Sequence, residues 1–173
     1  PYTNSEMWWL WVNQVAAQVK LTYPDKWVDA LAYPWSRSPP RFALESNVAI
    51  TYTIFGDGDM QQCESWGSPP ANCKSVNLYS WAFGGHMMGF RHYPSALRDY
   101  LQWGRDMLGA RAHFAQCGVA DWTIDGPKYY CAQTFQWNAD ADPSAVMTDF
   151  CDASYGSAST EMKAFWDRFE GVW

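Results

Sequence analysis

The sequence predicts an α/β protein in which about four parallel strands are combined with helices. The segment Val76–Phe83 shows this best, because it is an apolar and aromatic run of strand length that breaks at Gly84-Gly85. Three further runs of similar length are rich in apolar, aromatic or β-branched residues, and helical patterns recur along the same chain. Strands that alternate with helices are typical of parallel architecture. The predicted strands are Trp27–Tyr33, Asn47–Phe55, Val76–Phe83 and Ala110–Cys117.

The first helix is predicted before the first strand. Thr3-Asn4-Ser5-Glu6 fits a capping box, in which the Thr3 hydroxyl and the Glu6 carboxylate satisfy each other's backbone amides. Apolar residues then recur at helical spacing as far as Tyr23-Pro24. The residues of this stripe are Trp8, Val12, Val15 and Val19.

Four later helices are predicted from their end signals and apolar stripes. Caps, an N-terminal proline and C-terminal glycines mark their ends. These signals are Pro94 or Ser95 with Gly109, then Pro127, and Asp142-Pro143 with Gly156. The last helix is amphipathic, with Met162, Phe165, Trp166 and Phe169 on one stripe.

Four strands cannot close a barrel of the (β/α)₈ type, which needs eight strands and roughly 250 residues. The chain of 173 residues therefore forms either an open sheet or one half of such a barrel. Because it opens on a helix without a preceding strand, we favour the C-terminal half of a TIM-like barrel. We expect residues 1–137 to form the half-barrel and 138–173 to be a C-terminal helical extension of the same domain.

Composition and charge exclude some classes of partner. The net charge is −6 and the isoelectric point about 4.9, so the field repels phosphate backbones and nucleic acid is not expected as a partner. No apolar stretch approaches the roughly 20 residues that cross a bilayer, and the first residues do not resemble a signal peptide. We therefore expect no membrane segment in this sequence.

The cysteines and histidines give no metal-binding pattern. The five cysteines form no CxxC pair, and convergence of His86, His92 and His113 does not follow from their spacing. Cys63 and Cys73 flank a turn-rich loop that could bring them together, so we expect a disulfide between them and hence an exported protein. No metal or cofactor is expected.

Four segments resemble a known family. They are LAYPWSRSPP at Leu31–Pro40, NLYSWAF, ARAHFAQCG and QWNADADPSAVMTDFCDASYG. Together they are similar to an uncharacterised bacterial family of glycoside-hydrolase-like domains, known only as a domain of unknown function and related to α-glucuronidase-type (β/α)₈ barrels. The resemblance extends over nearly the whole chain and implies that the predicted strands are strands five to eight.

The chain departs from that family at two acidic positions. The resemblance leads us to expect Trp-Asp-Tyr and Phe-Glu-Gln at two strand ends, where this chain has Ala82 and Ala115 in place of the acids. Most glycosidases use a pair of carboxylates, so hydrolysis is uncertain. Asp57 and Asp121 are weak substitutes, as are Asp59 and Asp125, because aspartates in loops are more often turn formers or helix caps.

The ends of the predicted strands are better suited to binding a sugar than to cutting one. Aromatic faces can stack on pyranose rings, and a guanidinium can pair with the carboxylate of a uronic acid. Core packing is the alternative for the tryptophans, and a solvated side chain is the alternative for Arg37. The candidate binding residues are Tyr33, Trp35, Arg37, Trp81, His86, Gln116 and Trp122.

The functional prediction is a glycoside-hydrolase-like domain that acts on or binds a polysaccharide or oligosaccharide, including one that contains uronate. The alternative is a non-catalytic sugar-binding or structural module on a degenerate barrel. Exposed sheet edges are costly, so the missing N-terminal half of the barrel or a second chain is an expected partner. The expected location is extracellular or periplasmic.

Overall fold

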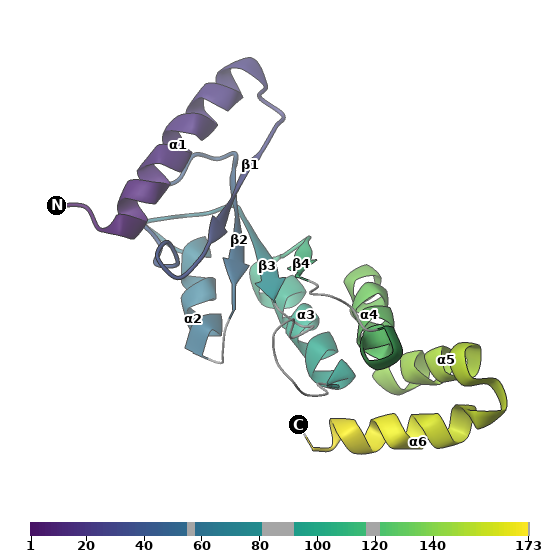
Figure 1. Ribbon diagram of the computed structural model, residues 1–173. Coiled ribbons are helices and arrows are strands. Elements are labelled where there is room, and N and C mark those ends of the chain that lie inside the picture. Colours follow the sequence, from purple (N-terminus) through teal and green to yellow (C-terminus); the bar gives the residue numbers. More distant parts are fainter. Residues whose placement is uncertain (55–57, 81–91, 117–121, 173) are drawn as a thin grey trace. The chain divides into compact units, whose positions relative to one another are not determined.

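The computed structural model describes the chain except residues 55–57, 81–91, 117–121 and 173 (Figure 1). The chain divides into two compact units. The first unit contains residues 1–80 and 104–114, and the second contains residues 81–103 and 115–173.

The first unit is built on a four-stranded sheet in the order β1-β2-β3-β4, with all strands parallel (Figure 1). This confirms the predicted α/β fold and is consistent with half of a (β/α)₈ barrel. The strand ends differ from those predicted by up to three residues, and residues 55, 81–83 and 117 of the predicted strands lie outside the described residues. The strands are β1 Val28–Ala32, β2 Val48–Thr53, β3 Ser75–Ser80 and β4 His113–Ala115.

The first helix, α1 (Asn4–Thr22), begins at the predicted capping box. The Glu6 amide donates to Thr3 Oγ1 at 3.2 Å, and the Thr3 amide donates to Glu6 Oε2 at 2.8 Å. The buried stripe differs from the predicted one, because Trp9 and Ala16 are buried with Val12. Trp9 lies inward because its ring packs edge-on against Trp66, with 4.7 Å between ring centroids.

A short helix, α2 (Gly58–Glu64), follows β2 and was not predicted. It continues into the 3₁₀ helix η1 (Ser65–Gly67). The predicted disulfide is wrong, since Cys63 and Cys73 are free buried thiols. Cys63 lies in α2, where burial raises its pKa to about 12, whereas the Cys73 thiol donates to the carbonyl of Ser75 at 3.3 Å.

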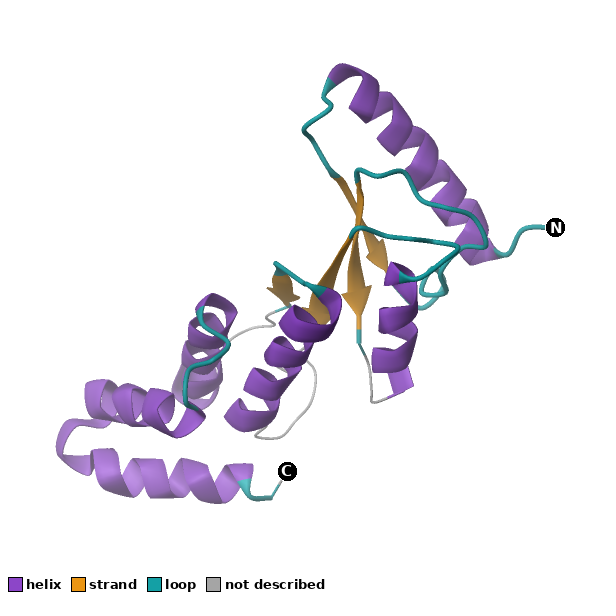
Figure 2. Ribbon diagram, turned by 180° about the vertical axis from the view of Figure 1, so that it is seen from behind, coloured by secondary structure: helices purple, strands orange, loops and turns teal. Residues whose placement is uncertain are grey.

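One face of the sheet packs against helices. Leu78 on β3 is buried against Gly104 in α3 (Pro94–Leu108), and Figure 2 shows the end of this helix in front of the strands. A Cβ atom at Gly104 would overlap the Leu78 side chain, so glycine permits this close approach. Gly109 ends α3 with φ of +63°, as its predicted role in the cap requires.

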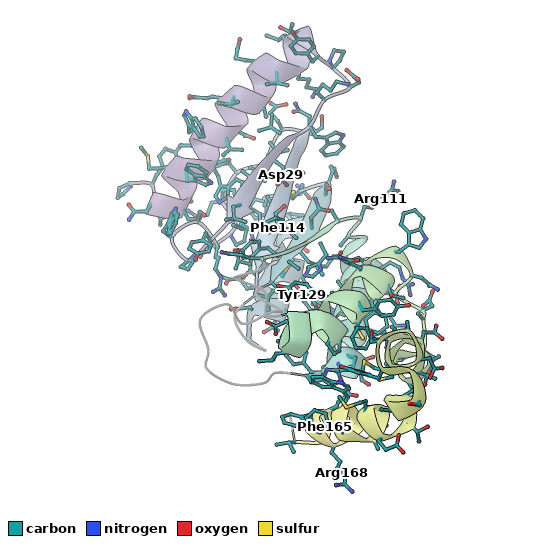
Figure 3. The ribbon with its side chains drawn as sticks, turned by 45° about the vertical axis from the view of Figure 1, so that its right-hand side comes forward. Asp29, Arg111, Phe114, Tyr129, Phe165 and Arg168 are labelled. Carbon is teal, nitrogen blue, oxygen red and sulfur yellow. The ribbon has the colours of Figure 1, made fainter. Side chains whose placement is uncertain are left out.

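The opposite face of the sheet carries polar and aromatic side chains. Thr51 on β2 donates to the Asp29 carboxylate on β1 at 2.8 Å, and partial burial raises the pKa of Asp29. Tyr79 on β3 stacks on Phe114 of β4 with 5.2 Å between ring centroids. Alternation along parallel strands in register places Asp29 and Tyr79 on the same face, and Figure 3 labels Asp29 and Phe114.

The second unit is helical in its described C-terminal part, which includes the two predicted C-terminal helices. Its elements are α4 Trp122–Trp137, α5 Pro143–Tyr155, η2 Gly156–Ala158 and α6 Ser159–Glu170. Asp142 caps α5 by accepting from the Ala145 amide at 2.8 Å, as predicted. Helix α4 begins five residues before Pro127, so the prediction that this proline opens the helix is wrong.

The core of this unit is formed where these helices pack together. Met147 and Phe150 of α5, Cys131 of α4 and Trp166 of α6 are all buried. The last helix buries less than the sequence predicted, because Phe165 is 42% exposed while Trp166 is enclosed. The amphipathic pattern found the helix but overstated the width of its buried stripe.

Candidate functional site

The loop after β1 presents an aromatic pair. Tyr33 and Trp35 follow the carboxyl end of this strand, and their rings meet edge-on with 4.8 Å between centroids and 66° between planes. The Trp35 side chain is 62% exposed, whereas Trp9 and Trp66 of the same unit are fully buried. An exposed indole that packs against a neighbouring ring offers a stacking surface.

Ser36 fixes the conformation of this loop. Its hydroxyl accepts from the Tyr33 amide at 3.1 Å and donates to the Leu31 carbonyl at 3.1 Å, while its own amide donates to the Tyr33 carbonyl at 2.7 Å. From α1, the indole N–H of Trp9 donates to the Ser36 carbonyl at 2.8 Å. Ser36 is 1% exposed, and these bonds close the turn from Tyr33 to Ser36, which contains the exposed Trp35.

Arg37 lies against the sheet. Its guanidinium forms an ion pair with Asp59 in the first turn of α2, and its Nε donates to the Tyr52 hydroxyl at 3.3 Å. The guanidinium carbon is 5.5 Å from the centroid of the Tyr52 ring. The side chains of Arg37 and Asp59 are only 16% and 17% exposed. Arg37 therefore joins the loop after β1 to β2 and α2, and the alternative of a solvated side chain is wrong.

The hydrogen bonds continue from Tyr52 into α2. The Tyr52 hydroxyl donates to Gln62 Oε1 at 2.8 Å, and burial of this side chain raises the pKa of the phenol. Gln62 Nε2 in turn donates to the Ser38 hydroxyl at 3.4 Å in an exposed position. Sequence patterns did not indicate roles for Tyr52 or Gln62, apart from the strand pattern around Tyr52, because these roles depend on α2, which was not predicted.

Only part of the predicted binding set can be placed together. Tyr33, Trp35 and Arg37 form one group in the first unit, whereas Gln116 follows β4 in the second unit and is exposed. Trp122 begins α4, and its side chain is outside the described residues. The other predicted positions fall wholly outside the described residues: Asp57, Trp81, Ala82, His86 and Asp121.

Two of the candidate acids are committed to ion pairs. Asp59 pairs with Arg37, as described above, and Asp125 pairs with Lys128 one turn along α4. The Asp125 and Lys128 side chains are both largely buried. Ala115, which stands where the resemblance implies an acid, is the last residue of β4. These two aspartates act as structural anchors.

The two described histidines belong to different units and have different neighbours. His113 Nε2 is 2.8 Å from the Ser80 hydroxyl in the first unit, whereas His92 packs against Trp166 in the second, with 4.9 Å between ring centroids. Burial lowers the pKa of each to about 4. In the part of the chain that the structure describes, no three His, Cys, Asp or Glu side chains form a group able to hold a metal ion.

Comparison with known proteins connects the first unit to a family. Residues 2–68 match the family model of DUF4838, a domain of unknown function. The matched region contains the aromatic pair, the Arg37–Asp59 ion pair and the elements α1, β1, β2 and α2. The resemblance to a domain of unknown function is thereby confirmed for this region. No curated protein and no solved structure matches the chain.

None of the helices among the described residues is long and apolar enough to cross a membrane.

Proposed function

We propose that this domain binds carbohydrate through the aromatic pair Tyr33 and Trp35. The observation that supports the proposal is the exposed Trp35 ring, which is supported by Tyr33 and held by the buried turn at Ser36. The pair follows the carboxyl end of a parallel strand, the edge at which β/α proteins meet their ligands. Sugar rings present C–H faces that stack on an indole without requiring a charge on the protein.

Other tryptophans are also exposed, so exposure alone does not identify Trp35 as the binding residue. Trp137 is 94% exposed, but it is the last residue of α4 and does not follow a strand in the chain. Trp11 is also exposed, on the outer face of α1. Trp35 differs because its position after β1 is fixed by hydrogen bonds from two directions, so the binding surface is formed before a ligand arrives.

The described acidic residues favour sugar binding without hydrolysis. Asp59 and Asp125 form ion pairs with the side chains of Arg37 and Lys128. Ala115 stands where the resemblance implies an acid at the end of β4. A glycosidase needs one carboxyl group to protonate the leaving oxygen and another to act on the anomeric carbon or on water. We therefore infer a glycoside-hydrolase-like domain that works as a non-catalytic binding module.

The same sheet supports a proposal about partners. Strand β1 is the first of the four strands in the sheet order, and Leu31 within it is 38% exposed. The edge strand of a parallel sheet has backbone N–H and C=O groups that can pair with a further strand. Closure of a barrel pairs these groups and removes both edges. We infer that the half-barrel is completed by an N-terminal half or by a second chain.

The proposed location is extracellular or periplasmic, because polysaccharides are found there. The free thiols of Cys63 and Cys73 remove the support that a disulfide would have given, so the location rests on the proposed ligand alone.

Substitution of Trp35 by alanine tests the binding proposal. The purified protein is titrated with soluble glucans and xylans while its affinity is measured by calorimetry. We expect Trp35→Ala to weaken binding at least about fivefold, taking for a sugar ring the value of about 1–3 kcal/mol that stacking of one base on an aromatic ring contributes. Trp137→Ala is the matched control, because it removes a more exposed indole from the end of a helix. Equal binding by Trp35→Ala, or no binding by the unsubstituted protein, would overturn the proposal.

A further inference from the structure

We propose that the sugar bound at Tyr33 and Trp35 is neutral and that the Arg37–Asp59 ion pair excludes uronate. This inference rests on the proposed carbohydrate binding and names the substrate class of the same surface. It replaces the sequence-based expectation that Arg37 recognises the carboxylate of a uronic acid.

The guanidinium of Arg37 already has the partners that a uronate carboxylate would offer. Asp59 supplies a carboxylate, the Tyr52 hydroxyl accepts from Nε at 3.3 Å, and the Tyr52 ring lies beneath the charge. A uronate that paired with the guanidinium edge now bound to Asp59 would have to displace this aspartate. That exchange would leave the Asp59 carboxylate, which is 17% exposed, without its counter-charge.

The backbone around Arg37 also opposes a movement toward solvent. The indole N–H of Trp66 donates to the Arg37 carbonyl at 3.0 Å, and Trp66 is fully buried against Trp9. The neighbouring Ser36 is held by the buried hydrogen bonds of its turn. These contacts hold the backbone at Arg37 in place, so its guanidinium can turn outward only by giving up Asp59 and the Tyr52 hydroxyl and ring.

The net charge of the chain also disfavours a uronate ligand. A net charge of −6 gives a field that repels an anionic polymer and leaves a neutral one unaffected. A uronate-bearing ligand would need a local cation to overcome this repulsion. The two arginines between β1 and β2, Arg37 and Arg41, are paired with Asp59 and Glu6.

Ser38, three residues after Trp35, and its partner Gln62 carry neutral hydrogen-bonding groups. The Ser38 hydroxyl is exposed and accepts a long bond, 3.4 Å, from Gln62 Nε2. A hydroxyl and a carboxamide can each donate to and accept from a sugar hydroxyl, and a bond of this length is readily exchanged for a shorter one. These groups suit the hydroxyls of a neutral pyranose that stacks on Trp35.

The test compares two ligands that differ only in charge. One is a neutral gluco-oligosaccharide, and the other is the same oligosaccharide after oxidation of its 6-hydroxymethyl groups to carboxylates. Calorimetry at low ionic strength should show that the oxidised ligand binds at least tenfold more weakly. The same measurement is made with Asp59→Asn, which removes the negative charge from beside Arg37 with little change in side-chain volume. We expect this variant to reduce the difference between the two ligands at least threefold, with thermal unfolding as the check that it is folded.

The outcomes separate this inference from the proposed function. If neither ligand binds, the proposed function fails and this inference fails with it. If the oxidised ligand binds as tightly as the neutral one or more tightly, carbohydrate binding stands and the exclusion of uronate is wrong. Binding to the Arg37→Lys variant is then measured as well. Weaker binding of the oxidised ligand alone would show that Arg37 binds its carboxylates.

Discussion

The indole N–H of Trp9 in α1 donates to the carbonyl of Ser36 in the loop after β1, across 2.8 Å. Both residues are buried, Trp9 completely and Ser36 to within 1%. The bond thus connects the first helix to the turn that contains the exposed Trp35 and precedes Arg37. The geometry of the proposed binding surface depends on a residue that does not itself reach the ligand.

Replacing Trp9 by phenylalanine tests this connection. The smaller ring keeps much of the apolar contact with Trp66 but leaves the Ser36 carbonyl buried without its donor, which costs about 1–3 kcal/mol in addition to lost packing. We expect the free energy of unfolding in urea to fall by at least that amount. Trp11→Phe is the control, because Trp11 is 56% exposed and its substitution should change stability by less than about 0.5 kcal/mol. Similar losses in both variants would contradict the assigned role.

Glu6 gives a prediction for acid pH. The Arg41 guanidinium, whose Nε donates to Glu6 Oε1 at 2.6 Å, together with the Thr3 amide lowers the pKa of Glu6 to about 2. A carboxyl group with a depressed pKa stabilises the folded state above its unfolded pKa, and this contribution is lost as the pH falls through the folded value. We expect Glu6→Gln to lower the thermal midpoint at pH 7, with a difference that shrinks as the pH falls from about 4.5 toward 2.

The control for this experiment is Glu45→Gln. Glu45 pairs with Lys20 at 3.4 Å, and both side chains are substantially exposed, so this pair should contribute little. If Glu45→Gln lowers the midpoint as much as Glu6→Gln does, the effect belongs to general surface charge and the assignment to the capping box is wrong.

Local sequence signals predicted the helix ends and the strands well. The capping box at Thr3 and Glu6 and the N-cap at Asp142 need only residues a few positions apart, and both form as expected. The four strands were found because their apolar and β-branched character is also local. Their order in the sheet follows the chain, which is the simplest outcome for successive parallel strands.

Contacts between distant segments explain what the sequence did not predict. Trp8 and Trp9 fit an amphipathic helix almost equally well, and the choice of Trp9 as the buried ring depends on Trp66 and Ser36. Helix α2 begins with Gly58 and Asp59, which are weak helix formers, and the ion pair with Arg37 fixes its first turn. The change of Arg37 from a predicted ligand-binding group to a structural one has the same origin.

Burial of His92 should make the free energy of unfolding depend on pH in the mildly acidic range. Its ring is 1% exposed, its Nδ1 has no hydrogen-bond partner in the described part of the chain, and burial lowers its pKa to about 4. The unfolded chain therefore binds more protons than the folded one between about pH 6.5 and pH 4. The stabilising effect of keeping His92 neutral is complete above pH 6.5 and is lost as the pH falls toward 4, by on the order of 3 kcal/mol.

Substitution of His92 by phenylalanine isolates this contribution. The new ring can still pack against Trp166 but cannot take up a proton. Urea unfolding at pH 7, 6, 5 and 4, followed by helical circular dichroism, should show a smaller loss of stability in the variant than in the unsubstituted protein. Lys128 and Asp167 also act on the His92 ring, so the comparison is made at one fixed ionic strength. Parallel pH profiles for the two proteins would show that His92 does not control this dependence.

Gly104 tests the packing of α3 against the sheet. In an exposed helix interior, replacing glycine by alanine is favourable by about 1 kcal/mol. At Gly104 the added methyl group would instead overlap the side chain of Leu78, which is 1% exposed and has little room to move. We therefore expect Gly104→Ala to lower the free energy of unfolding by about 1–3 kcal/mol, the usual cost of overpacking.

Two further variants complete this test. Gly67→Ala adds the same methyl group where no atom lies within 4 Å, so it should leave packing unchanged. Leu78→Val removes one methylene from the overlapping side chain, and in combination with Gly104→Ala it should cost less than the sum of the two single substitutions. Because residues in contact are expected to deviate from additivity by 0.5–3 kcal/mol in a double-mutant cycle, strictly additive losses would show that the two side chains do not meet. A gain in stability for Gly104→Ala alone would mean that helix propensity outweighs the close approach.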